Sequence, residues 1–174
     1  MNHKKRKALF LDRDGVINVD KGYVCKIEEF EFIDGIFDIC KKAKDLGYLI
    51  FVVTNQSGIG RGYYSEDDFH KLMKFVEDQF REKGIVIEKV YFCPYHAENG
   101  IGKYKKESFD RKPNPGMILK AEKEFNLDLA SSIMIGDNEK DIEAAIAAGV
   151  GKKVLVSSSG NFSTKADMVI SSLH

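Results

Sequence analysis

The sequence is poor in several features that would point to a particular class of protein. Its three cysteines, at positions 25, 40 and 93, are odd in number and widely spaced, which argues against a disulfide framework. No apolar run approaches the roughly 20 residues that a membrane-spanning helix needs, and too few apolar residues follow the basic N-terminus for a signal peptide. Net charge is absent too, because 27 basic residues balance 27 acidic ones, which disfavours general nucleic-acid binding. We therefore expect a cytoplasmic protein that binds neither membrane nor nucleic acid.

What the sequence does contain is the composition of a folded domain. Apolar residues make up 43% and charged residues 31% of the chain, which excludes a disordered or collagen-like protein. A length of 174 residues suits one domain and is short for two. We accordingly expect a single domain over residues 1–174.

Short apolar runs alternate with segments of helical periodicity along the chain. The runs typical of strands buried on both faces are Ala8–Leu11, Tyr48–Val53, Val90–Phe92, Ile133–Ile135 and Val154–Val156. The helical segments run from Ile36 to Gly47, from the N-cap Ser65 to Gly84, from the N-cap Asn114 and first residue Pro115 through Phe125, and through Ile142 and Ile146 to Gly149. This alternation predicts an α/β fold, a doubly wound, Rossmann-like parallel sheet with helices on both faces. The one long irregular loop lies at about 94–113.

Three of the predicted strands run directly into polar clusters. These clusters are Asp12-Arg13-Asp14-Gly15, Thr54-Asn55-Gln56-Ser57-Gly58 and Gly136-Asp137-Asn138. Open parallel sheets bind ligands outside the carboxyl ends of their strands, so we expect the three clusters to meet in one crevice. A single aspartate at a strand end is usually a turn or a cap, whereas three such ends favour a binding or catalytic site.

The residue types in this crevice favour phosphoryl chemistry. Asp12, Asp14 and Asp137 would repel one another without a cation, and a set of oxygen ligands suits Mg²⁺. Thr54 and Lys112 could supply the donors and the positive charge that a phosphoryl group needs. Two aspartates two positions apart can serve as nucleophile and general acid/base. For an isolated D-x-D pattern, an Asx-turn would be the better interpretation.

Other phosphate-binding motifs do not fit. The chain has no G-x-x-x-x-G-K-[ST] sequence, so it is not a P-loop enzyme. The segment Gly58–Gly62 lacks the third glycine of a dinucleotide fingerprint, because Tyr63 occupies that position. We interpret this segment as a glycine-rich loop that approaches a ligand, or as a flexible turn.

The order and spacing of four motifs resemble those of the haloacid-dehalogenase-like phosphatases. The four are Asp12-Arg13-Asp14-Gly15-Val16, Thr54-Asn55-Gln56, Arg111-Lys112-Pro113 and Gly136-Asp137-x-x-x-Asp141. Three longer segments resemble the D-glycero-D-manno-heptose 1,7-bisphosphate phosphatases within that superfamily: Asn18–Tyr23, Asn55–Ile59 and Arg111–Met117. The resemblance extends from Ala8 to about Val156.

The resemblance implies a Mg²⁺-dependent phosphatase without a large cap domain. By this resemblance, Asp12 forms an aspartyl-phosphate, and Asp14 acts first as general acid and then as general base. Mg²⁺ is held by the carboxylates of Asp12 and Asp137 and by the backbone carbonyl of Asp14, while Asp141 orients the metal shell. The catalytic set is completed by the two residues that hold the phosphoryl oxygens, Thr54 and Lys112.

The implied substrate is a small sugar phosphate, and the implied reaction removes the 7-phosphate in nucleotide-activated heptose biosynthesis for cell-surface polysaccharide. Arg111 recognises this substrate, and its place before a helix N-terminus suits a phosphate role. The sugar pocket is lined by Asp20, Lys21, Gly22, Tyr23, Asn55, Gln56 and Ser57. We expect the enzyme to act as a monomer.

The sequence departs from the family pattern in the long loop. Many members hold a structural zinc there, but Tyr95, Ser108 and Asp110 replace three of the expected ligands and leave only Cys93. Structural zinc needs four ligands, so we expect no zinc and a loop that is packed by ordinary contacts or mobile. A rearranged site that uses Cys93, His96 and Asp110 is the less favoured alternative. Asn138 also stands where the family usually has lysine.

Three alternative functions compete with the heptose assignment. A histidinol-phosphate phosphatase, or another small phosphomonoester hydrolase, would share most of these motifs. A non-catalytic phosphate-binding module is disfavoured because all the catalytic groups are present. A phosphatase of nucleic-acid ends is disfavoured by the zero net charge and by the few aromatic residues near the basic loop.

Overall fold

The computed structural model describes residues 4–159 and 163–174. The strands are β1 (Ala8–Leu11), β2 (Leu49–Asn55), β3 (Ile87–Cys93), β4 (Ile133–Gly136), β5 (Lys152–Val156) and β6 (Met168–Ile170). The α-helices are α1 (Ile36–Asp45), α2 (Ser57–Gly60), α3 (Glu66–Glu82), α4 (Gly116–Phe125) and α5 (Glu139–Ala148). The 3₁₀-helices are η1 (Ile27–Glu29), η2 (Gly102–Tyr104) and η3 (Leu129–Ser131). None of the helices in the described ranges is long and apolar enough to cross a membrane.

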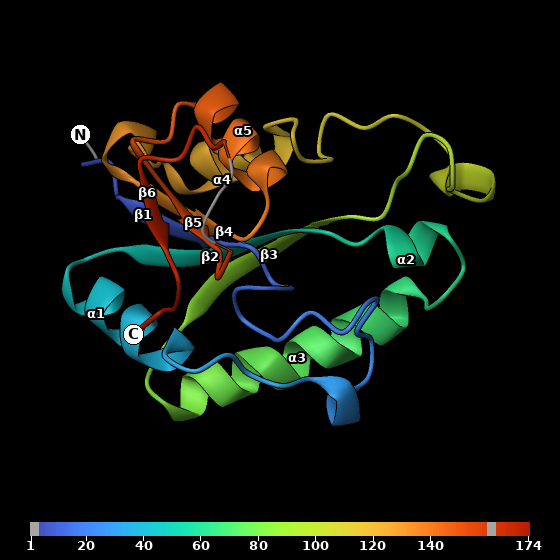
Figure 1. Cartoon of the computed structure of the whole chain (residues 1–174), viewed down its shortest axis with the longest axis horizontal. Coiled ribbons are helices and arrows are strands. Elements are labelled where there is room, and N and C mark those ends of the chain that lie inside the picture. Colours follow the sequence, from blue (N-terminus) through green and yellow to red (C-terminus); the bar gives the residue numbers. More distant parts are fainter. Residues whose placement is uncertain (1–3, 160–162) are drawn as a thin grey trace.

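The strands form one parallel sheet in the order β3-β2-β1-β4-β5-β6. This order reverses direction at β1, as in doubly wound α/β folds. Helices lie on both sides of the sheet (Figure 1), and no second domain caps the strand ends in the described parts of the chain. The predicted fold class is therefore confirmed.

Alternate side chains of the central strands build two separate cores. Leu9 and Leu11 of β1 point into the core beneath α1 and α3, whereas Phe10 points into the core beneath α4 and α5. In β2, Val52 and Val53 divide in the same way. Because strand side chains alternate in direction, a strand that is apolar at every position must be covered on both faces.

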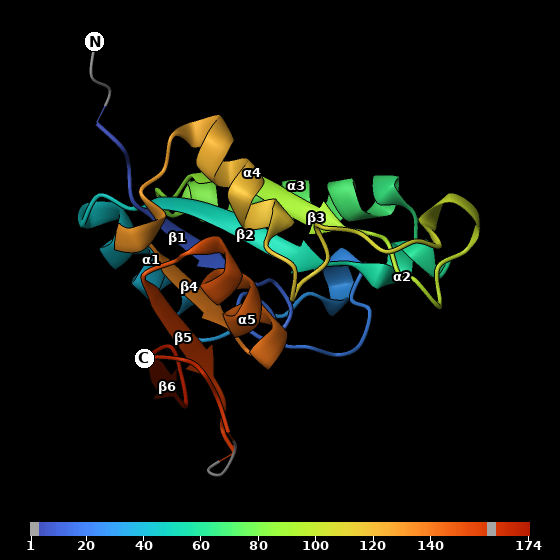
Figure 2. The same ribbon diagram turned by 90° about the horizontal axis from the view of Figure 1, so that it is seen from above.

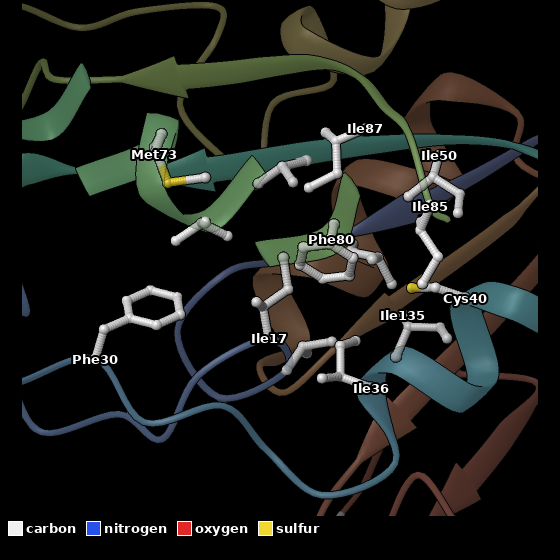
Figure 3. Close-up of a cluster of buried hydrophobic side chains, with 14 of the residues drawn as sticks. Ile17, Phe30, Ile36, Cys40, Ile50, Met73, Phe80, Ile85, Ile87 and Ile135 are labelled. Carbon is white, nitrogen blue, oxygen red and sulfur yellow. The ribbon is translucent and has the colours of Figure 1, made fainter. Parts of the chain in front are cut away.

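The core beneath α1 and α3 also anchors the long connection between β1 and α1. Ile17 and Phe30 of this connection belong to the same buried cluster as Phe80 of α3 and Ile50 of β2 (Figure 3). Ile17 is fully buried, and Phe30 is nearly so. The segment from Asp20 to Tyr23, which lies between these anchors, is thereby held near the strand ends.

Several element boundaries differ from the sequence prediction. β2 continues through Thr54 and Asn55, so these polar residues end the strand rather than follow it. β6 was not predicted, because it has three residues at the sheet edge and two of them are exposed. Leu46 and Ile146 are apolar residues of the predicted helical segments, and their spacing predicts buried side chains, but both side chains are exposed.

The start of α4 and the glycine-rich segment also differ from expectation. Asn114 does not cap α4; the helix begins at Gly116 with Pro115 in the N-cap position, and the Asn114 amide donates to the carbonyl of Ser108 instead. The predicted glycine-rich loop is the short helix α2. A side chain at Gly60 would lie 2.3 Å from the Pro94 carbonyl oxygen, so glycine there permits close packing of the backbone.

The 94–113 loop follows β3 and extends beyond the carboxyl ends of the strands. Its only regular element in the structure is η2. Figure 2 shows this yellow-green segment at the same end of the molecule as α2, and the Ile101 amide donates to the carbonyl of Gly60. The predicted irregular loop at 94–113 is confirmed, but it is not the one long loop, because residues 12–35 between β1 and α1 contain only η1 as a regular element.

Candidate active site

The polar residues that follow β1, β2 and β4 meet at the carboxyl ends of the sheet, as predicted. They surround a cavity of about 380 Å³, a size that suits a small metabolite. Its lining residues are Asp12, Asp14, Asp20, Gly22, Tyr23, Asn55, Gln56, Ser57, Gly58, Tyr64, Lys112, Asp137, Asn138, Lys140 and Asp141. The cavity therefore unites residues that are separated by more than 120 positions in the chain.

Lys112 occupies the floor of this cavity and joins three elements. Its Nζ lies 3.0 Å from Asp12 Oδ1 and 2.5 Å from Asp141 Oδ1, and it donates to the Val53 carbonyl at 2.9 Å. The Asn55 side chain forms two hydrogen bonds with the Lys112 backbone. It accepts from the N–H at 3.0 Å and donates to the C=O at 3.1 Å. Asn55 thus positions Lys112 at the end of the long loop.

Three carboxylates converge above Lys112. Asp12, Asp137 and Asp141 each offer an oxygen within 4.8 Å of the other two. Burial and the nearby Asp141 raise the pKa of Asp12 well above its usual value, although Lys112 opposes this shift. Burial also raises the pKa of Asp137 to about 6. Burial acts to lower the pKa of Lys112, but the attraction of Asp12 and Asp141 outweighs it and raises that pKa.

This acidic group fits a hard divalent cation. One lysine cannot balance three carboxylates, and the raised pKa values of Asp12 and Asp137 reflect the free energy of holding these two groups buried beside other carboxylates. Carboxylate oxygens at this spacing are the donors that Mg²⁺ prefers. The residues present are therefore suited to Mg²⁺, with the carboxylates of Asp12 and Asp137 both in the group.

The tight turn after β1 brings Asp137 against the backbone. Gly15 adopts a φ of +91°, and its N–H donates to the Asn18 carbonyl at 2.8 Å. A Cβ at Gly15 would lie 1.9 Å from Asp137 Oδ2. Only glycine has room here, and it also avoids the strain that a positive φ imposes on other residues.

The side chain of Asp14 lies apart from the acidic group, although its carbonyl is a predicted metal ligand. Its carboxylate accepts hydrogen bonds from Arg13 at 2.9 Å, from Asn18 at 3.0 Å and from Gln56 at 3.2 Å. Arg13 is fully buried and donates also to the Val24 carbonyl. Its guanidinium carbon lies 5.8 Å from the centre of the Phe30 ring. The two aspartates of the D-x-D pattern therefore occupy different environments.

Most of the predicted substrate residues line the cavity, but three predicted site residues do not. Thr54 is buried, and its hydroxyl oxygen accepts a hydrogen bond from Nε2 of the cavity residue Gln56 at 2.9 Å. Lys21 lies on the surface, where its Nζ pairs with Glu31 at 3.2 Å. Arg111 is half-buried, and its Nη1 is buried without a hydrogen-bond partner among the described residues. Burial lowers the pKa of Arg111.

The positions that correspond to zinc ligands make other contacts. Asp110 Oδ2 lies 2.5 Å from the Nζ of Lys120. His96 Nδ1 accepts from two backbone N–H groups of its own turn, at 3.2 and 3.0 Å. Burial raises the pKa of the Cys93 thiol, although the nearby Tyr95 backbone and Ser108 side chain oppose this shift. In the described ranges these residues do not form a metal-ligand cluster, whereas the three aspartates of the floor do.

Sequence reasoning missed several residues of the site. Tyr64 and Lys140 line the cavity, and Arg13 and Asn18 hold Asp14. Arg13 carried a signal, because a charged residue between a buried strand and an aspartate is a candidate for a buried ion pair. Tyr64 carried none, since it precedes the N-cap Ser65 and resembles an ordinary loop residue.

Comparisons with known proteins place the chain among related sequences of one family. Residues 109–171 match the HAD-hydrolase-like family model. A relative from Burkholderia mallei, D-glycero-alpha-D-manno-heptose-1,7-bisphosphate 7-phosphatase, is 60% identical over 152 residues, which cover 87% of this chain and 80% of the relative. A Vibrio cholerae relative, D-glycero-beta-D-manno-heptose-1,7-bisphosphate 7-phosphatase, is 50% identical over 151 residues, 87% of this chain and 81% of that protein.

A solved structure is similar over almost the whole chain. It is the D,D-heptose 1,7-bisphosphate phosphatase from B. bronchiseptica, complexed with magnesium and phosphate. The two structures superpose with a TM-score of 0.81 and 26% identity, covering 96% of this chain and 93% of that one. The fold is therefore shared with that phosphatase.

Proposed function

This chain belongs to the heptose-1,7-bisphosphate 7-phosphatase family of haloacid-dehalogenase-like hydrolases, and on that premise we propose that it removes the 7-phosphate from D-glycero-D-manno-heptose 1,7-bisphosphate. The observation that carries the proposal is the cavity floor, where Lys112 holds Asp12 beside Asp137 and Asp141. A phosphomonoester that enters the cavity meets a nucleophile, an acid and a cation at the same edge of the sheet.

In this proposal, Asp12 is the nucleophile. Its carboxylate attacks the phosphorus and forms an aspartyl-phosphate, while the bond to the sugar oxygen breaks and Asp14 protonates that oxygen. Asp14 then removes a proton from water, the water oxygen attacks the phosphorus, and inorganic phosphate leaves with Asp12 restored. The separate environment of Asp14 supports this division of roles, since its hydrogen bonds come from groups that do not touch Asp12.

The remaining floor residues bind the group in transfer. Lys112 Nζ and the Thr54 hydroxyl hold phosphoryl oxygens, and Asn55 fixes the backbone that carries Lys112. Asp12, Asp137 and the Asp14 carbonyl would hold Mg²⁺, which neutralises negative charge on the phosphoryl group when bound. Asp141 orients this end of the cavity through its contacts with Lys112 and with the N–H of Asn138.

Substrate choice falls to residues on the rim of the cavity. Asp20, Gly22, Tyr23 and Ser57 line it and can contact the sugar hydroxyl groups. Arg111 lies outside the cavity lining and is half-buried, with one guanidinium nitrogen that has no partner among the described residues, so its guanidinium would bind a second phosphate that extends beyond the cavity. This feature favours a bisphosphate over a substrate with one phosphate.

The test is a panel of phosphate esters assayed for phosphate release with Mg²⁺ and after its removal by a chelator. We expect heptose 1,7-bisphosphate to have the highest kcat/KM, and we expect activity to disappear without Mg²⁺ and to return when it is added. Preferred hydrolysis of histidinol phosphate would replace the heptose assignment. Unchanged turnover without a divalent cation would contradict the assigned role of the three aspartates.

A further inference from the structure

Gln56 borders the cavity, but both ends of its side-chain amide bind neighbouring side chains rather than being free for an incoming sugar. The residue is only 2% exposed. Its Nε2 donates to Asp14 Oδ2 at 3.2 Å and to Thr54 Oγ1 at 2.9 Å, while its Oε1 accepts from the hydroxyl of Tyr64. An amide N–H₂ has two donors, and here both are used. Gln56 therefore ties the proposed acid to a proposed phosphoryl-binding hydroxyl.

The chemistry of its partners determines which way the Gln56 amide points. A carboxylate only accepts hydrogen bonds, so the N–H₂ group must face Asp14. The Oε1 then faces Tyr64, which donates its hydroxyl proton. Without that hydroxyl, Oε1 would be a buried acceptor without a donor. Movement of the amide out of this position would then lower the free energy of the protein.

Tyr64 is itself rigidly placed. It is 8% exposed and lies directly before Ser65, whose capping box with Asp68 fixes the start of α3. A Cβ at Gly58 would lie 2.3 Å from the Tyr64 ring, so the ring packs directly on the backbone of α2. The hydroxyl is thus held at one place between α2 and α3.

We propose that Tyr64 and Gln56 are positioning residues that hold the Asp14 carboxyl and the Thr54 hydroxyl ready for reaction. This inference rests on the proposed function, because it assumes that Asp14 protonates the leaving sugar oxygen. The hydrogen bonds run from Tyr64 to Gln56 and from Gln56 to both residues. Gln56 thereby acts on the chemistry of the leaving group rather than on recognition of the sugar.

The leaving group separates this role from a purely structural one. A sugar alkoxide is strongly basic and needs the acid, whereas the p-nitrophenolate of p-nitrophenyl phosphate leaves without protonation. The parameter to compare is kcat/KM, because it includes only the steps up to phosphoenzyme formation. Loss of the Thr54 contact alone would affect both esters equally, so the ratio between them reports on Asp14.

The test variant is Tyr64→Phe, which keeps the ring that packs on Gly58 and removes only the hydroxyl. We expect kcat/KM for heptose 1,7-bisphosphate to fall about tenfold and that for p-nitrophenyl phosphate to fall no more than about twofold. Gln56→Leu should give the same pattern with a larger ratio. Tyr48→Phe is the matched control, because Tyr48 directly precedes β2, at the end of the strand away from Gln56, and loss of its hydroxyl should change kcat/KM for neither ester.

Asp14→Asn distinguishes failure of this inference from failure of the proposed function. Suppose that Asp14→Asn lowers kcat/KM selectively for the sugar ester, but Tyr64→Phe lowers kcat/KM equally for both esters or for neither. The positioning role is then wrong, and the acid assignment stands. If Asp14→Asn itself shows no selective loss, both proposals fail. A melting temperature of Tyr64→Phe close to that of the wild type confirms that the ratio is read on folded enzyme.

Discussion

The floor of the cavity, which includes Lys112 at the end of the 94–113 loop, and the exposed remainder of that loop use the same kind of ion pair in opposite surroundings. On the floor, Lys112 contacts Asp12 and Asp141 at 3.0 and 2.5 Å with 4% of its side chain exposed. In the loop, Asp110 contacts Lys120 at 2.5 Å, but 55% of the Lys120 side chain is exposed. The distances are alike, so burial decides how much each pair contributes to stability.

Burial also determines in which of the two regions a residue can be replaced at little cost in stability. The floor groups are held by one another and by backbone carbonyls, so each replacement leaves a charge without its partner. The loop is held by several separate surface contacts, among them the hydrogen bond of Tyr104 to Glu66 and the Lys106 ammonium 4.1 Å from the Tyr95 ring. Each of these contacts is weak, but they are several and independent of one another. The loop can therefore fold with Tyr95, Ser108 and Asp110 at the positions of expected zinc ligands.

The largest expected effect lies on the floor, with Asp12→Asn. We expect phosphate release to fall by more than about a thousandfold, because the amide cannot act as the nucleophile. The fold should survive, since the change removes one of three neighbouring carboxylates. Circular dichroism of the purified variant supplies the control. Substantial turnover by folded Asp12→Asn would rule out the aspartyl-phosphate mechanism.

Removal of the cation from each pair tests the comparison of stability directly. In Mg²⁺-free buffer at pH 7, we expect Lys112→Met to lower the free energy of unfolding by about 3 kcal/mol, because buried carboxylates lose their partner. Lys120→Met should lower it by no more than about 1 kcal/mol. Urea denaturation measures both. Equal losses would show that burial does not separate the two regions.

A smaller effect, confined to substrate selection, is expected at the boundary between floor and loop. Arg111→Ala should raise KM for a sugar bisphosphate by about tenfold and leave KM for a monophosphate nearly unchanged, because one charge-assisted hydrogen bond is lost. Lys103→Ala is the matched control, since Lys103 is an exposed cation of the same loop. An equal rise in KM for both substrates would remove Arg111 from recognition of the second phosphate.

The smallest effect concerns zinc in the loop. We expect the purified protein to contain no stoichiometric zinc, and we expect a zinc chelator to leave its melting temperature unchanged. The physical reason is that Asp110 pairs with Lys120 and that His96 accepts hydrogen bonds from its own turn. Elemental analysis gives the answer, and one zinc per chain would show that the loop rearranges to bind the metal.

The sequence predicted the fold well where the signals are local. Apolar runs located β1, β4 and β5, and Ser65 and Gly149 marked a helix start and a helix end that the structure confirms. The prediction failed for β6, whose three residues carry too little pattern. It also failed at Asn114, because the preference for an N-cap was outweighed by the bond of its amide to the Ser108 carbonyl.

Sequence and tertiary structure determined different properties of the site. Residue type and strand position were enough to predict that Asp12, Asp14 and Asp137 meet at one edge, because parallel strands end on the same side. The different surroundings of Asp12 and Asp14 were decided by tertiary contacts. Examples are the contacts of Lys112 with Asp12, 100 positions away, and with Asn55, 57 positions away. The assignment of Gln56 to Tyr64 and Asp14, rather than to the sugar, was decided in the same way. Hydrogen bonds are sensitive to changes of a few tenths of an ångström in the distance between donor and acceptor, and only packing of the complete chain sets those distances.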